Sequence, residues 1–118
     1  MAGRVVVYGT QPKFNLGAQM EFLTRFFALY RRGKLPGLHP STNPIRSIST
    51  RSKPPDLACA VQKELSRKAD VVVINATCPD DLNGVKPDSR ICVVSTQPQT
   101  VVTSLTRARQ LLNSNSCP

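Results

Sequence analysis

The most prominent chemistry in this sequence belongs to the basic side chains of its first half. Residues 1–53 carry nine Lys or Arg and one acid, a net charge of +8, whereas residues 54–118 carry seven bases and six acids, a net charge of +1. Such an excess attracts polyanions, most commonly nucleic-acid phosphates, although a basic surface can also serve solubility alone. The polyanion-binding residues expected from this pattern are Arg31, Arg32, Lys34, Arg46, Arg51 and Lys53.

A second candidate site is the turn that joins the first expected strand to the first expected helix. Gly9, Thr10, Asn15 and Gly17 stand between these elements, where free backbone N–H groups and the helix dipole can hold a phosphate. The two glycines are eight positions apart, so the G-x-G-x-x-G pattern is absent, and no Walker lysine follows Gly17. The same residues also suit a simple turn glycine followed by a packing glycine.

Catalytic and metal-binding patterns are weak elsewhere in the sequence. Asp80 and Asp81 follow a buried strand, where open α/β sheets place their ligands, but Pro-Asp-Asp-Leu-Asn-Gly is also typical of a turn with a capping acid. His39 is the single histidine, so no Ser-His-acid or Cys-His pair can be argued. We therefore expect no catalytic residue, no metal site and no cofactor, and an enzyme is the less favoured class.

The four cysteines, Cys59, Cys78, Cys92 and Cys117, contain no C-x-x-C pair, and a zinc site would need long-range convergence. Cys59 and Cys92 lie on expected core faces and suit small apolar residues. Cys78 in a loop and Cys117 near the end of the chain are candidate free thiols. This pattern favours a reducing compartment, while the even count leaves a disulfide open.

Apolar runs and helical periodicity predict the elements that position these residues. Buried strands are expected at residues 4–8, 70–75 and 90–94, with a short edge strand at 45–50. A first helix follows Asn15 and ends before Gly33, and a second is capped by Asp56. The spacing of Thr96 and Gln99 predicts a capping box. It would begin a final helix with the core stripe Val101, Leu105, Ala108 and Leu112.

These elements have the order β-α-(β)-α-β-β-α, which predicts a single small layered α/β domain over residues 1–112. Residues 34–55 are a basic Pro-rich loop or edge segment, and residues 113–118 are expected to be a flexible tail. The sheet, flanked by helices, is either Rossmann-like or thioredoxin-like, with a hairpin between the last two strands in the thioredoxin-like case. The thirteen-residue loop 77–89 between these strands allows a hairpin or a minimal parallel crossover. In topology alone the order resembles the thioredoxin-like small subunits of mitochondrial ribosomes and respiratory complexes.

Length and composition exclude several classes of protein. A chain of 118 residues that is 40% hydrophobic can bury a core, and no apolar run approaches the length of a membrane span. We expect an intracellular, non-secreted protein, with mitochondrial and cytoplasmic locations both open. Its expected partner is nucleic acid, RNA more than DNA, or an acidic protein surface, within a ribonucleoprotein assembly and without catalysis.

Two other functions stay open. One is a structural subunit of a protein complex, because Phe22, Phe26 and Leu29 widen the apolar face of the first helix. The other is a small phosphate- or nucleotide-binding enzyme that uses the turn from Gly9 to Gly17.

Overall fold

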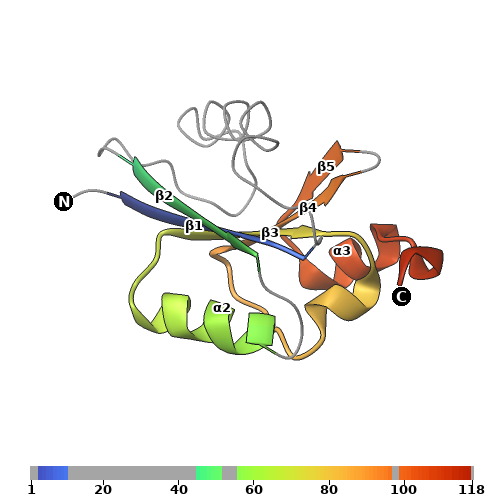
Figure 1. The fold of residues 1–118 in the computed structure, drawn as a ribbon, viewed down its shortest axis with the longest axis horizontal. Coiled ribbons are helices and arrows are strands. Elements are labelled where there is room, and N and C mark those ends of the chain that lie inside the picture. The colour runs from blue at the N-terminus through green and yellow to red at the C-terminus, as the bar shows by residue number, and fades with distance from the viewer. Residues whose placement is uncertain (1–2, 11–44, 52–55, 97–98, 118) are drawn as a thin grey trace.

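The computed structural model describes residues 3–10, 45–51, 56–96 and 99–117, and it confirms a small α/β protein (Figure 1). A five-stranded sheet has the order β2-β1-β3-β4-β5. The first four of these strands pair in parallel and β5 pairs antiparallel with β4. The strands are β1 (Gly3–Gly9), β2 (Ile45–Arg51), β3 (Val71–Ala76), β4 (Ile91–Thr96) and β5 (Gln99–Val102). The helices are α2 (Asp56–Ser66) and α3 (Leu105–Leu111), with the 3-10 helices η1 (Pro79–Leu82) and η2 (Ser114–Ser116).

The central strands are buried on both faces, as their continuous apolar runs predict. On one face Val72 and Ile74 of β3 pack with the helices, and on the other face Val71 and Val73 are equally buried. Strand β4 repeats this pattern, with Ile91 and Val93 on one face and Cys92 and Val94 on the other. Burial on both faces is typical of the central strands of a parallel sheet.

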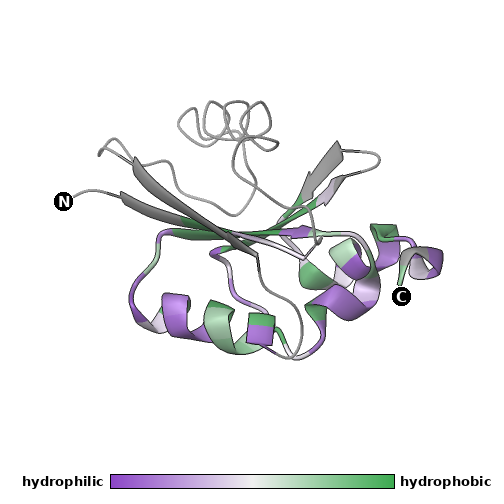
Figure 2. Cartoon of the chain, in the orientation of Figure 1, coloured by the Kyte–Doolittle hydropathy of each residue, from purple (hydrophilic) through white to green (hydrophobic). Residues whose placement is uncertain are grey.

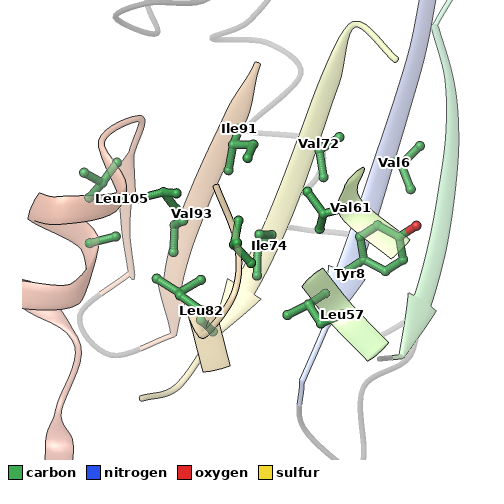
Figure 3. Close-up of a cluster of buried hydrophobic side chains, with 14 of the residues drawn as sticks. Val6, Tyr8, Leu57, Val61, Val72, Ile74, Leu82, Ile91, Val93 and Leu105 are labelled. Carbon is green, nitrogen blue, oxygen red and sulfur yellow. The ribbon is translucent and has the colours of Figure 1, made fainter. Parts of the chain in front are cut away.

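The main core forms where α2, α3 and η1 cover one face of the sheet (Figure 1). In Figure 2 the central strands are hydrophobic, whereas hydrophobic and hydrophilic residues alternate along α2. Leu57, Val61 and Leu65 are buried, as the periodicity of α2 predicts. Figure 3 shows Leu57 and Val61 against Tyr8 of β1 and Ile74 of β3.

The prediction that Cys59 belongs to the core is wrong, because Cys59 is exposed. Two residues of an α-helix turn the chain by about 200°. Cys59 is therefore carried away from the buried stripe that begins at Leu57.

Strands β3 and β4 are parallel, with Val72 opposite Ile91 and Ile74 opposite Val93. The thioredoxin-like alternative needs a hairpin between these two strands, and they do not form one. The connection between them contains η1, whose Leu82 is fully buried in the core. A short helix with one apolar anchor thus takes the place of a longer crossover helix.

The prediction for the final helix is wrong at its start. Gln99–Val102 form β5, with Val101 opposite Val94 of β4, so the expected capping box at Thr96 and Gln99 does not form. Helix α3 begins later, where the Ser104 side chain accepts a hydrogen bond from the Arg107 N–H at 3.3 Å. The β-branched run at residues 100–102 favours a strand as soon as a partner strand is present. Leu105, Ala108 and Leu112 are buried as predicted.

Strand β2 is the outermost strand on its side of the described sheet, and this confirms the edge strand expected near residues 45–50. The first predicted helix lies outside the described residues. Within the described ranges, no helix has the length and apolar character needed to cross a membrane.

Candidate functional site

The carboxyl ends of β1, β2 and β3 lie at one edge of the sheet, because the three strands are parallel. The pairing sets Gly9 of β1 opposite Arg51 of β2 on one side and opposite Asn75 of β3 on the other. Thr10 follows directly after Gly9, and Thr77 follows directly after the last residue of β3. Open α/β sheets bind their ligands at the carboxyl ends of the strands, so this edge is the natural place to look for a site.

Thr10 is the part of the predicted phosphate turn that the structure describes in most detail. Its side chain donates to Asp81 Oδ2 at 2.9 Å and lies 3.3 Å from the Asn75 carbonyl oxygen, which also accepts the Thr10 N–H at 3.3 Å. The residue is only 4% exposed. These donors serve the protein itself, so a phosphate at Thr10 would have to displace existing hydrogen bonds. Asn15 and Gly17 lie outside the described residues.

Asp81 ties the end of β1 to the turn that follows β3. Besides Thr10, its Oδ2 accepts from the Thr77 N–H at 2.9 Å, the Thr77 hydroxyl at 3.1 Å and the Cys78 N–H at 3.2 Å. This arrangement matches the capping-acid interpretation of the Pro-Asp-Asp-Leu-Asn-Gly sequence. Asp80 is exposed beside it. No group of three His, Cys, Asp or Glu side chains that could hold a metal occurs among the described residues.

A disulfide joins Cys78 to Cys117 at this end of the sheet, with a Cα–Cα distance of 5.3 Å. The sequence left this bond open beside the free-thiol alternative, because no local pattern marks two cysteines that lie 39 positions apart. Cys59 and Cys92 are free. Burial raises the pKa of the Cys92 thiol to about 12, which makes it a poor nucleophile.

Two of the six predicted polyanion-binding residues lie in β2, and the structure does not gather them into one cluster. Arg46 and Arg51 stand near opposite ends of the strand, which separates them by about 16 Å along an extended backbone. The odd number of steps between them places the two residues on opposite faces of the sheet. Arg31, Arg32, Lys34 and Lys53 lie outside the described residues.

An ion pair not anticipated from the sequence fixes the amino end of β4. Arg90 donates to both carboxylate oxygens of Asp88 at 2.9 Å and to the Leu65 carbonyl at the end of α2 at 3.0 Å. The hydrogen bond from Arg90 lowers the pKa of Asp88 below its ordinary value, and the same bond raises the pKa of Arg90. A shallow hollow of about 330 Å³ lies beside the pair. Its lining is Pro87, Asp88, Ser89 and residues 103–106.

Comparison of this chain with protein families, with curated proteins and with solved structures finds no match.

Proposed function

We propose that this protein binds RNA or a similar extended polyanion through its phosphates, without catalysis, as part of a ribonucleoprotein assembly. The observation that carries the proposal is that β2, an outermost strand of the described sheet, has an arginine near each end in a chain of net charge +9. No acid stands between Glu21 and Asp56, so the sequence around β2 offers no neutralising partner of its own.

The spacing within β2 favours an extended polyanion over a single phosphate group. Arg46 and Arg51 are about 16 Å apart, too far to grip one phosphate together. Phosphates along one strand of a nucleic acid recur at a much shorter interval, about 3.4 Å along a duplex axis. A nucleic-acid strand that runs along the outer edge of β2 can therefore contact each arginine through a different phosphate.

The residues between these arginines suit the same role. Ser47, Ser49 and Thr50 carry hydroxyl groups, which commonly donate hydrogen bonds to phosphate oxygens. Contacts of this kind fix a nucleic acid in place and carry little sequence information. We therefore expect binding that depends strongly on salt and weakly on base sequence.

A second candidate is a small phosphate-bearing ligand, such as a nucleotide, at the carboxyl ends of β1 and β3. The strand order supports it: the chain passes from β1 to β2 on one side and returns to β3 on the other. This second candidate includes a doubly wound, Rossmann-like architecture for the sheet. In such sheets a reversal of this kind creates the ligand crevice. Two features make it the weaker candidate. The donors of Thr10 are engaged, and the carboxylate of Asp81 would repel an anion.

The role of a structural subunit rests on Phe22, Phe26 and Leu29 and stays a prediction, because these residues lie outside the described ranges.

Binding of a fluorescent single-stranded RNA, measured by anisotropy across a salt series, tests the proposal. The perturbation is the double variant Arg46→Glu, Arg51→Glu. Its matched control is Lys63→Glu, Arg107→Glu, which makes the same change of charge at two exposed positions on α2 and α3. The slope of log K against log salt is negative, and each lost phosphate contact makes it less steep by about 0.7 for a single strand. The β2 variant should therefore have a slope that is less steep by about 1.4, and the control should keep a slope near that of the wild type.

Equal effects of the two variants would show that total charge, and not β2, governs binding. Absence of RNA binding at low salt, or binding that ignores salt, would refute the proposal. Thermal stabilisation by a mononucleotide without any affinity for RNA would support the second candidate instead.

A further inference from the structure

The Cys78–Cys117 disulfide fastens the last described residues to the carboxyl edge of the sheet. Cys78 stands two residues after the end of β3 and caps η1. Figure 1 shows the last described residues, which include η2, beside α3 and η1, at the end of the sheet where β1 and β3 finish. The bond therefore connects the end of the chain to the turn that Asp81 organises.

The Cys78 side of this bond is held in place independently of the disulfide. Its N–H donates to Asp81 Oδ2 at 3.2 Å, and its carbonyl accepts the Asp81 N–H at 3.1 Å. Cys78 is 1% exposed. Breaking the disulfide would leave all of these backbone contacts intact.

The Cys117 side has no comparable anchor among the described residues. In the segment 113–117, which we call the C-terminal turn, the Asn115 N–H donates to Asn113 Oδ1 at 2.9 Å and the Cys117 N–H to the Ser114 carbonyl at 3.3 Å. Both hydrogen bonds stay inside the segment, and Asn113, Ser114 and Asn115 are exposed. Among the described residues, the disulfide is thus the one link between this turn and the body of the protein beyond the chain connection to the buried Leu112.

We propose that this disulfide is a redox latch, opened by a low-molecular-weight thiol, that fastens or releases the C-terminal turn. A thiolate attacks Sγ of Cys117, the more exposed of the two residues, and forms a mixed disulfide with it. The Cys78–Cys117 S–S bond breaks, and Cys78 leaves as a thiolate that takes a proton from water. A second thiol attacks the sulfur of the reagent and releases Cys117 as a thiol. Two external thiols are oxidised to one external disulfide while the protein disulfide is reduced to two thiols.

The other two cysteines provide internal controls for this chemistry. Cys59 is exposed and should react with an alkylating reagent in either redox state of the protein. Cys92 is buried, and burial raises its pKa, so it should react only after unfolding. Alkylation of Cys78 and Cys117 can therefore be compared with that of Cys59, which always reacts, and that of Cys92, which does not react in the folded protein.

The test is alkylation of the folded full chain, with peptide mass spectrometry to locate the label. After oxidation by dissolved oxygen, Cys59 alone should be labelled, and after reduction with glutathione and removal of the reagent, Cys117 should be labelled as well. Labelling of Cys117 after the oxidising treatment would show that the bond does not form. Labelling of Cys117 only in denaturant would show a permanent structural disulfide. Either result overturns the proposal.

Amide hydrogen exchange supplies the second readout, because it reports local opening. Reduction, or the variant Cys117→Ser, should speed exchange at residues 113–117 and leave residues 77–82 protected. The matched control Cys59→Ser should change neither segment. Unchanged exchange at 113–117, or equal loss of protection in both segments, would contradict a latch that frees one end only.

Discussion

Replacing Asp81 by alanine removes the carboxylate oxygen on which the end of β1 and the turn after β3 converge. Oδ2 accepts four hydrogen bonds, from the Thr10 hydroxyl, the hydroxyl and N–H of Thr77, and the Cys78 N–H. Hydroxyl groups can rotate toward other acceptors, and the Thr10 hydroxyl already lies 3.3 Å from the Asn75 carbonyl. The two backbone N–H groups cannot turn away, so they carry most of the loss.

The expected magnitude follows from these two N–H groups. Hydrogen bonds to a charged acceptor contribute about 1.5–3 kcal/mol each, and two at the lower figure give about 3 kcal/mol of unfolding free energy. Urea unfolding followed by circular dichroism measures the change. With a slope of about 1.5 kcal/mol per molar, the midpoint should fall by about 2 M while the slope stays constant.

Asp80→Ala is the matched control, because Asp80 is the exposed neighbour of Asp81 in η1. A surface substitution of this kind should change stability by less than about 0.5 kcal/mol. Both proteins should be compared with the disulfide in the same redox state. If Asp81→Ala is as stable as Asp80→Ala, the hydrogen bonds to Asp81 do not hold the end of β1 to the turn after β3. The Thr10 donors would then be available to a small phosphate ligand.

Two further changes probe features away from this edge. Asp88→Asn removes the charged partner of Arg90. The pKa of Asp88 is lowered in the folded state, so the ionised side chain stabilises the fold. This stabilisation is fully present above the ordinary Asp pKa of about 4 and is lost as the pH falls through the lower folded value. The loss of stability on acidification should therefore be smaller in the variant than in the wild type, and identical pH profiles would contradict the role given to this pair. Lys68→Gly should stabilise the protein by about 1 kcal/mol in urea unfolding. Lys68 lies two residues after the end of α2 and has a φ of 63°, a conformation that glycine adopts without strain. A destabilised variant would contradict that assignment.

Local patterns were sufficient for the elements whose burial does not depend on a distant partner. The valine runs of β3 and the stripe Leu57, Val61 and Leu65 of α2 have one favourable solution each, a strand covered on both faces and an amphipathic helix. The capping role of Asp81 also follows from its own turn, because three of its four hydrogen bonds come from Thr77 and Cys78.

The exposure of Cys59 follows from the local turn of α2 and could have been predicted. The other errors arose where a distant segment decides the outcome. Residues 99–102 can begin a helix or form a strand, and pairing with β4 selects the strand. The bond from Thr10 to Asp81 spans 71 positions and the disulfide spans 39, so neither has a local signature. The parallel pairing of β3 with β4 likewise joins two strands whose connecting loop allows either direction.

Mapping of amide chemical shifts on addition of single-stranded RNA locates the contact on the protein without any substitution. Our proposal predicts that the largest changes among the described residues fall on β2, at residues 45–51, and weaken together as salt is raised. Changes centred on Thr10 and on residues 77–81, with β2 unaffected, would contradict it and would place the ligand at the carboxyl ends of β1 and β3.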